Sequence, residues 1–308
     1  MGKIIDTLRI SITDKCNFNC VYCSRKFNKV DRKEILSFEE IVEIVKILSL
    51  FGVEKIKITG GEPLIRKNLP FLIEKISKIE GIKEISLTTN GFYLSEKIDE
   101  LIITGLKRIN ISLDTLNKDK FKFITGLDYF DQVIYGIKRA IEKFSIIKLN
   151  VVLMKINFDE IFDFIEFAKE NNLILRFIEL MPVDNNLNFW KENFVAYTDA
   201  IKKIESKNRI YFLSQDRNTK YYLLELGNLK IGFITSMTEP FCSYCSKLRI
   251  DSVGNLFLCL YGKPVLNFKK LLYELNKEEI RKILIKKINS KSLFRNYSNF
   301  PVMNIIGG

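Results

Sequence analysis

Short runs of β-branched residues alternate with longer helical stretches over much of the chain, and this alternation limits the fold more than any other feature. Period-two patterning predicts strands over residues 9–13, 55–59, 84–89, 108–113, 148–154 and 175–180. The segments between them, such as FEEIVEIVKILSLF and FDQVIYGIKRAIEKF, place apolar residues at helical spacing. Successive β/α units imply parallel strands joined by right-handed crossovers. We therefore expect an α/β fold, a partial (β/α)6 version of the TIM barrel.

The β/α rhythm stops near residue 185. A loop, a short helix and several brief strand candidates follow, and residues 267–289 add further helical periodicity. This part reads as a smaller α+β domain. The expected division is a partial barrel over residues 1–195 and a C-terminal domain over residues 196–308.

Glycine and polar residues follow each of the first four predicted strands. They are Thr13-Asp14, Gly60-Gly61-Glu62-Pro63, Asn90-Gly91, and Ser112 with Asp114. Such residues also punctuate ordinary turns, so any one of them alone indicates only a loop. The carboxyl ends of barrel strands meet at one rim, where barrel active sites lie. Together they predict a functional rim at that end.

All six cysteines of the chain fall into two triplets. These are Cys16, Cys20 and Cys23 near the start, and Cys242, Cys245 and Cys259 near the end. Iron–sulfur clusters are held by cysteine thiolates, normally four for each 4Fe-4S cluster. A triplet would leave one iron without a protein ligand. Such an iron can bind and activate a small molecule.

Two other interpretations of the cysteines remain. Disulfide frameworks are typical of short secreted chains, whereas this chain has 308 residues and an N-terminal stretch without an apolar signal-peptide core. Structural zinc needs four Cys or His ligands, and the chain contains no histidine. An iron–sulfur cluster in a reducing cytoplasm explains the triplets better than either.

The composition predicts a soluble cytoplasmic protein with a large core, because 47% of the residues are hydrophobic and no run of 18 apolar residues occurs. The formal charge of +12 suits a polyanionic ligand such as a nucleotide. The basic residues are spread among acidic ones rather than clustered. We therefore expect neither a nucleic-acid partner nor a membrane.

The motif CNFNCVYC, with its C-x3-C-x2-C spacing, resembles the signature of the radical S-adenosylmethionine (SAM) superfamily, and TGGEP resembles that superfamily's methionine-binding motif. Within it, KITGGEPLIRK, LTTNG, INISLDTL, RFIELMPV, FCSYCSKLR and the terminal IGG resemble the GTP 3′,8-cyclases, the molybdenum cofactor biosynthesis protein A family. The resemblance runs from Leu8 to Gly308.

The resemblance implies that each cysteine triplet holds a 4Fe-4S cluster and that the first cluster binds and cleaves SAM. It implies that the following residues contact SAM: Tyr22, Gly61, Glu62, Ser112, Asp114 and Met181. Gly61 and Glu62 would meet the methionine amino group, Tyr22 the adenine, and Ser112 with Asp114 the ribose. The second cluster would bind the guanine of GTP.

The resemblance further implies that GTP is converted to 3′,8-cyclo-7,8-dihydro-GTP, the precursor of the pterin of molybdenum cofactor. The residues expected to bind GTP are Arg9, Lys57, Arg66, Thr88, Lys148, Lys247, Leu248 and Arg249. Leu248 can offer only its backbone. Arg176, Gly307 and Gly308 are expected to take part in catalysis. The family commonly has arginine where this chain has Lys57 and Lys247, and lysine lacks the bidentate fork.

A low-potential ferredoxin or flavodoxin is the implied electron donor, and a functional hand-off to the pyranopterin-forming enzyme is expected. The chain would act as a monomer or homodimer. Three alternatives stay open: another radical SAM enzyme with an auxiliary cluster, such as a peptide-modifying maturase; a zinc-bearing nucleic-acid-binding module; and a non-catalytic iron–sulfur carrier.

Overall fold

The computed structural model describes residues 5–23, 31–183, 186–216, 218–225, 227–240, 242 and 245–293. Within these residues one curved sheet of twelve strands runs through the molecule in the order β12-β11-β10-β1-β2-β3-β4-β5-β6-β9-β8-β7. The strands from β10 to β9 pair in parallel, and the strands beyond them at both edges are antiparallel. The predicted parallel barrel is thus confirmed and extended.

The parallel strands are β1 (Thr7–Ser11), β2 (Lys55–Thr59), β3 (Glu84–Thr89), β4 (Arg108–Ser112), β5 (Ile146–Leu153), β6 (Ile174–Glu179), β9 (Leu229–Ile234) and β10 (Lys247–Ile250). The edge strands are β7 (Ile210–Asp216), β8 (Thr219–Leu224), β11 (Asn255–Phe257) and β12 (Leu266–Asn267). The α-helices are α1 (Phe38–Ser49), α2 (Leu69–Ser77), α3 (Leu94–Ile103), α4 (Lys118–Thr125), α5 (Phe130–Lys143), α6 (Ile161–Glu170), α7 (Leu187–Asn193), α8 (Tyr197–Glu205), α9 (Phe268–Glu274) and α10 (Lys277–Asn289). Short 3₁₀ helices are η1 (Pro63–Ile65), η2 (Lys155–Glu160) and η4 (Ser290–Leu293).

The predicted bounds of β2 and β3 agree with the structure, whereas β1 starts two residues earlier than predicted. The reason is long-range pairing. The backbone N–H groups of Asp6 and Thr7 donate to the carbonyl of Ser246, at 3.2 and 3.3 Å, and so extend the ladder toward the amino end. Local patterning carries no information about this distant partner.

Helix α1 shows how local sequence sets these elements. Ser37 accepts a hydrogen bond from the Glu40 N–H at 3.1 Å while Glu40 accepts one from the Ser37 N–H at 2.6 Å, which is a capping box. The apolar residues Ile41, Ile44 and Leu48 fall at helical spacing and are fully buried. This helix therefore begins where its cap lies and faces the sheet with its apolar stripe.

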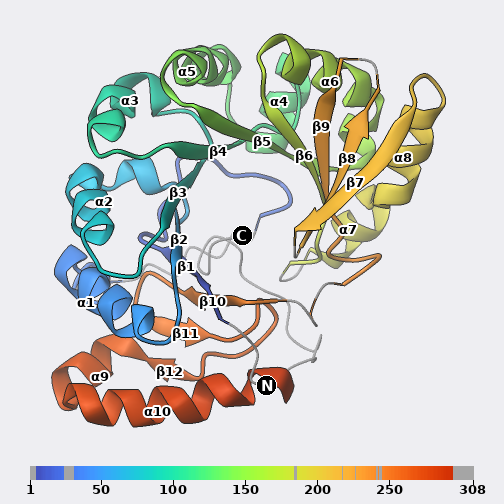
Figure 1. Cartoon of the computed structure of the whole chain (residues 1–308). Helices are drawn as coiled ribbons and strands as arrows, with labels where there is room; N and C mark the ends of the chain where they lie inside the picture. The colour runs from blue at the N-terminus through green and yellow to red at the C-terminus, as the bar shows by residue number, and fades with distance from the viewer. Residues whose placement is uncertain are drawn as a thin grey trace.

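The helices cover the outer face of the curved sheet, and the strands curve around the centre of the molecule (Figure 1). Side chains alternate between the two faces of each strand: in β1 Leu8 and Ile10 are fully buried in the core, while Arg9 points the other way, into the interior of the barrel. The barrel interior is consequently polar and cationic, and the apolar core lies between the sheet and its helices.

The strands that follow residue 196 extend both edges of the same sheet: β9 pairs with β6, and β10 pairs with β1. One hydrophobic core includes residues from both parts of the chain, for example Leu8, Leu248 and Phe268. The domain boundary at residue 195 stays a prediction, and the sheet is continuous across it. No helix among the described residues has the length and apolarity needed to cross a bilayer.

Candidate active site

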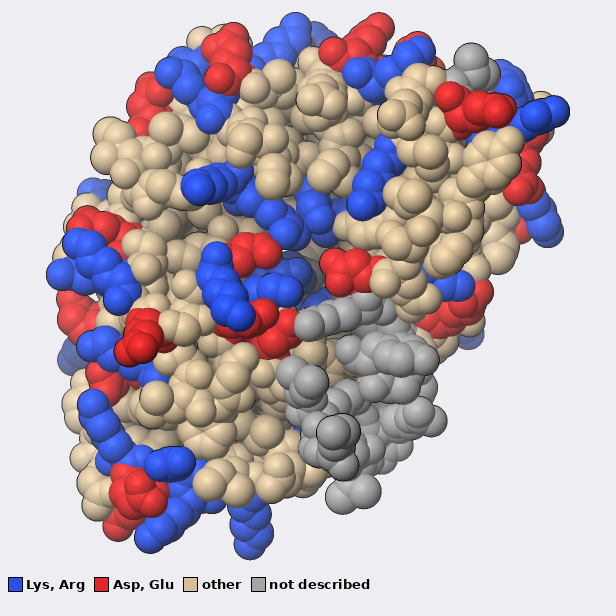
Figure 2. Space-filling model, viewed as in Figure 1, with Lys and Arg blue, Asp and Glu red and all other residues tan. Residues whose placement is uncertain are grey.

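A cavity of about 380 Å³ opens inside the curved sheet, and all six cysteines line it. The two triplets lie more than 200 positions apart in the sequence, yet both line the cavity. The first triplet follows the carboxyl end of β1, whereas Cys242 and Cys245 precede the amino end of β10, which pairs in parallel with β1, so the two triplets reach the cavity from opposite ends of these strands. Lys and Arg side chains gather in the hollow at the centre of this face, with Asp and Glu at its edge (Figure 2). The functional rim predicted from the strand ends is therefore a real cavity.

The loop of the first triplet rests on the glycine pair that follows β2. The N–H of Gly61 donates to the Thr13 carbonyl at 2.7 Å, and the N–H of Glu62 donates to the Lys15 carbonyl at 2.8 Å. A Cβ on Gly61 would lie 2.8 Å from the Asp14 carbonyl oxygen and closer still to that of Lys15. Only glycine permits this approach of two backbones.

The cysteines of the first triplet are partly buried. Burial raises the pKa of Cys16 to about 12 and raises the pKa of Cys20 well above its usual value. The Phe18 N–H and the Asn90 side-chain amide donate to the Cys16 sulfur, at 3.4 and 3.9 Å. In the described part of the chain no three Cys, Asp or Glu side chains converge as ligands of a single ion. Thiolates of an iron–sulfur cluster bind separate irons, and N–H donors around the sulfurs are part of such sites.

Glu62 is a buried carboxylate at the centre of the rim, 1% exposed. It accepts hydrogen bonds from the Asn90 N–H at 2.7 Å, the Leu64 N–H at 3.0 Å and the Thr89 hydroxyl at 2.8 Å. Burial raises the pKa of Glu62 to about 7, although these donors oppose the rise. A cationic group, such as an amino group, would pair favourably with it.

Tyr22, inside the first triplet, is fixed by Asp114 from the loop after β4. The tyrosine hydroxyl donates to one carboxylate oxygen at 2.6 Å, and the Val152 N–H donates to the other at 2.7 Å. Burial raises the pKa of Asp114 to about 6. Asp114 does not line the cavity, whereas Tyr22 does. The structure therefore gives Asp114 a supporting position beside Tyr22, and its contact with the ribose of SAM stays a prediction.

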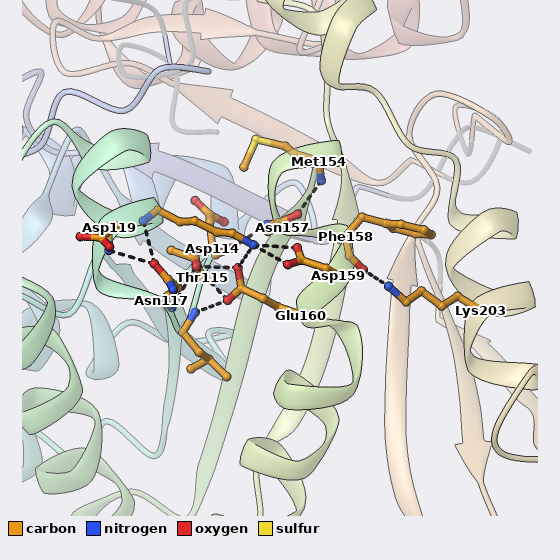
Figure 3. A network of polar contacts seen from close by, with 12 residues as sticks. Asp114, Thr115, Asn117, Asp119, Met154, Asn157, Phe158, Asp159, Glu160 and Lys203 are labelled. Atoms are coloured by element: carbon orange, nitrogen blue, oxygen red, sulfur yellow. Dashed lines mark hydrogen bonds and ion pairs between the residues drawn. The ribbon is translucent and has the colours of Figure 1, made fainter.

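The loop that carries Asp114 is itself held by η2 (Figure 3). The Asn157 amide donates to the carbonyls of Asp114 and Val152, at 2.6 and 2.8 Å, and accepts from the Met154 N–H at 2.9 Å. The Glu160 carboxylate accepts from the Thr115 hydroxyl at 2.8 Å. A chain of buried hydrogen bonds thus runs from η2 to Tyr22 and the cysteine loop.

Five cations from four strands, β1, β2, β6 and β10, form a cation wall in the cavity. They are Arg9, Lys57, Arg176, Lys247 and Arg249. Burial, followed by the neighbouring arginines, lowers the pKa of Arg9 to about 9 and that of Lys57 to about 7. Burial lowers the pKa of Arg176 to about 10 and that of Lys247 well below its usual value. This many cations in one cavity favour a multiply charged anion.

Several buried polar atoms of the cavity wall have no hydrogen-bond partner among the described residues. They are Arg9 Nε, Asn150 Oδ1, Arg176 Nε and Ser236 Oγ. Buried polar groups are nearly always paired, and exceptions commonly mark a missing ligand. Two donors from guanidinium groups and an amide acceptor suit a polar, anionic ligand such as a nucleotide.

Most of the expected site residues line this one cavity. Besides the six cysteines they are Arg9, Tyr22, Lys57, Gly61, Glu62, Thr88, Ser112, Arg176, Met181, Lys247 and Arg249. Four others are not among the lining residues: Arg66, Lys148, Leu248 and Asp114. Gly307 and Gly308 lie outside the described residues.

Arg66 and Lys148 are engaged by other parts of the protein. The Arg66 guanidinium donates to the Ile12 and Leu36 carbonyls, at 2.7 and 2.6 Å, and stacks on Phe38. Lys148 is 8% exposed, and its ammonium group donates to the Tyr221 hydroxyl at 3.1 Å. The side chain of Leu248 is fully buried in the core. Arg66 is thus placed as a brace between loops.

Sequence reasoning missed several lining residues: Asn110, Asn150, Glu179, Tyr261 and Lys291. Asn110 could have been found, because period-two alternation puts it on the same face of β4 as Ser112. In the structure the Arg176 guanidinium donates to the Asn110 amide oxygen at 2.8 Å. Lys291 comes from η4, which no strand pattern predicts to lie at the rim.

Comparison with known proteins agrees with this geometry. A family model described as the radical SAM superfamily matches residues 10–168, and one described as Molybdenum Cofactor Synthesis C matches residues 173–295. The GTP 3′,8-cyclase of Clostridium perfringens strain 13 is 39% identical over 96% of this chain and 93% of its own. That of Thermodesulfovibrio yellowstonii is 40% identical over all of this chain and 98% of its own.

A solved structure of SuiB from Streptococcus suis bound to its precursor peptide SuiA covers 91% of this chain and 67% of that one, with a TM-score of 0.63. At 18% identity this likeness concerns the fold alone. The predicted fold class, a radical SAM partial barrel with a C-terminal extension, is confirmed. By the matches over nearly its whole length, this chain belongs to the radical SAM superfamily and, within it, to the GTP 3′,8-cyclase family.

Proposed function

We propose that this chain converts GTP into (8S)-3′,8-cyclo-7,8-dihydroguanosine 5′-triphosphate, the first step of molybdenum cofactor biosynthesis. The observation that carries the proposal is that both cysteine triplets, the GGEP segment and the cation wall line one cavity. Cofactor and substrate chemistry can therefore occur within a single enclosed space. The relatives named GTP 3′,8-cyclase support the same reaction.

Cys16, Cys20 and Cys23 would hold one 4Fe-4S cluster, and Cys242, Cys245 and Cys259 the other. When bound, the first cluster supplies the electron that cleaves SAM and so provides the radical that removes one hydrogen atom from the substrate. Glu62 lies where it can accept the amino group of SAM, and Gly61 beside it lets the cysteine loop pack closely against this part of the cavity. Tyr22, Ser112 and Met181 complete this side of the cavity.

The cation wall would hold the triphosphate of GTP. Arg9, Arg176 and Arg249 can each present two parallel N–H groups to phosphate oxygens, while Lys57 and Lys247 act as point charges. Fixing the triphosphate positions the ribose relative to the SAM side of the cavity. Thr88 adds a hydroxyl on β3, between the two sides.

We further propose that the enzyme works in the cytoplasm as a monomer or homodimer, takes electrons from a low-potential ferredoxin or flavodoxin, and passes its product to the pyranopterin-forming enzyme. Free cysteines that serve as cluster ligands suit a reducing compartment. These points rest on the family rather than on the cavity.

The test is an anaerobic turnover assay on reconstituted protein with dithionite and SAM, with and without GTP. Formation of 5′-deoxyadenosine together with an isomer of GTP that carries a new C3′–C8 bond is the expected result. If 5′-deoxyadenosine forms but GTP changes neither its yield nor the products, the substrate proposal fails. A peptide-modifying activity would leave GTP unchanged in the same assay.

A further inference from the structure

Glu179, the last residue of β6, is a buried carboxylate to which the proposed chemistry gives no task. It is 2% exposed and lines the cavity next to Met181. One carboxylate oxygen accepts hydrogen bonds from the Tyr197 N–H at 3.0 Å and the Thr238 hydroxyl at 2.6 Å. The other accepts from the N–H groups of Met237 and Thr238, at 2.8 and 3.0 Å.

Two of these donor residues belong to the segment that leads from β9 to the second cysteine triplet. Cys242 follows Thr238 by four positions. The Thr235 hydroxyl donates to the Glu239 carbonyl at 3.1 Å, and the Glu239 N–H donates to the Thr235 carbonyl at 3.3 Å, which closes a turn between them. This turn displays the two N–H groups toward Glu179. The end of β6 is thereby joined directly to the chain that enters the second triplet.

The shell around Glu179 consists of donors. Three of them are backbone N–H groups, which cannot reverse their polarity, and the fourth is a hydroxyl. A carboxylate accepts through both oxygens, whereas the amide of glutamine must point two N–H bonds at one pair of donors. Buried donors that face each other stay unpaired, and each one costs its free energy of desolvation. Only an acidic side chain satisfies this position.

We propose that Glu179 is the positioning residue of the second cysteine triplet: it fastens the Met237–Thr238 segment to β6 and so holds Cys242 at the cavity wall. This inference rests on the proposed function and deepens it, because it concerns how the segment that leads to the second cluster is held at the carboxyl end of β6. Met181, two residues further on, faces the SAM side. Glu179 thus couples the two halves of the cavity.

Glu179→Gln tests the proposal, and Glu239→Gln is the matched control. Glu239 lies on the same segment, but its side chain is 49% exposed and pairs with Lys220 and the Tyr197 hydroxyl rather than with the segment's backbone. Both variants remove one negative charge. Only Glu179→Gln removes the carboxylate that accepts hydrogen bonds from Met237 and Thr238.

The readout is iron content after anaerobic reconstitution, together with the electron paramagnetic resonance of the reduced protein. Wild type and Glu239→Gln should bind about eight irons per chain, two 4Fe-4S clusters, whereas Glu179→Gln should keep about four. Glu179→Gln should still form 5′-deoxyadenosine from SAM, because the first triplet is not fastened by Glu179. Retention of about eight irons, or an equal loss of both clusters, would overturn the proposal.

A milder variant keeps the test decisive if Glu179→Gln does not fold. Thr238→Val removes one of the four donors and preserves the shape of the side chain. Iron of the second cluster should pass to a chelator about tenfold faster than in wild type, which corresponds to ~1.4 kcal/mol. Hydrogen exchange at the Met237 and Thr238 amides of the iron-free chain should also accelerate. An unchanged chelation rate would sink the proposal.

Iron uptake also separates this inference from the proposed function. A wild-type protein that binds both clusters but does not convert GTP would refute the substrate assignment alone. The positioning role of Glu179 would then still be judged by the iron content of its variants.

Discussion

Arg9 on β1 and Arg249 on β10 are register partners on adjacent parallel strands, and both line the cavity. Burial, and then the charge of Arg249, lowers the pKa of Arg9 to about 9. Two guanidinium groups side by side in a buried wall repel each other unless an anion lies between them. Without its ligand the cavity is therefore a source of instability, which the ligand relieves.

Arg9→Gln should stabilise the ligand-free protein while weakening GTP binding. We expect the free energy of unfolding to rise by about 1 kcal/mol and GTP affinity to fall at least about tenfold, because a repelled cation and a phosphate donor are lost together. Calorimetry of unfolding and of GTP binding measures both. Arg139→Gln, at a surface pair with Asp99, should alter neither by more than ~0.5 kcal/mol. A destabilised Arg9→Gln protein would contradict this account.

GTP binding should take up protons at pH 8. Burial lowers the pKa of Lys57 and of Lys148 to about 7, so both are mostly neutral at pH 8 in the free protein. A triphosphate favours the charged forms and raises these pKa values, so protons enter with the ligand. Titration calorimetry in two buffers of different ionisation enthalpy gives the proton count. Lys57→Met should reduce the uptake, and proton release at pH 8 would be the opposite of the expected sign.

The same lowered pKa makes the ligand-free protein sensitive to pH. For Lys57 the folded value lies below the unfolded one, so the unfolded chain binds more protons and the stability of the fold rises as pH increases above about 7. The destabilisation that comes from burying the charged Lys57 side chain is fully present at and below about pH 7. Lys57→Met should therefore raise the melting temperature at pH 6 and have little effect at pH 10. Equal effects at both values would show that packing, not charge, is responsible.

Asn157→Ala should destabilise the protein by about 2–4 kcal/mol, because it leaves two carbonyls and one N–H of the β4–η2 junction unpaired. Since Asn157 supports the loop of Asp114 and hence Tyr22, SAM affinity should also fall. Urea unfolding and equilibrium binding of SAM check the two effects. Lys203→Met removes the bond to the Phe158 carbonyl and the cation–π contact with the Phe158 ring, at the edge of the same network (Figure 3), and should cost about 1 kcal/mol.

Gly61→Ala should abolish incorporation of the first cluster, because the added methyl collides with the backbone of the cysteine loop at Asp14 and Lys15. Iron analysis should show about four irons rather than about eight. Gly105→Ala is a fair comparison. Its φ of +77° makes alanine strained, yet nothing lies within 4 Å of the added Cβ. It should cost ~1 kcal/mol of stability and leave both clusters in place.

The sequence predicted the strands and the rim well because both follow from local rules. Apolar alternation located β2 and β3 to the residue, and parallel strands necessarily bring their carboxyl ends together. The direction of a side chain on an irregular segment is different, since it depends on distant partners. Arg66 follows η1 and turns to Phe38, and Asp114 turns to Tyr22 rather than to the cavity.

Glu179 is a second residue whose partners could not be predicted from the local sequence. The motif RFIELMPV marks the end of β6, but nothing local indicates that the glutamate will meet N–H groups from residues 197, 237 and 238. Asn110 and Asn150 carried a usable signal. Each lies two residues along a strand from a predicted site residue and therefore on the same face.

The pairing of β10 with β1 determines when, during synthesis, the chain can become an active enzyme. Some 240 residues separate Arg9 from its register partner Arg249, so the inner strand β1 keeps an unpaired edge throughout most of translation. Contacts of such high sequence separation form late and slowly. The first cysteine loop is made early, whereas the cation wall and the second triplet exist only once the ribosome has passed residue 259. A nascent chain thus has the groups that would hold a radical-generating cluster well before it has a closed place to confine the radical.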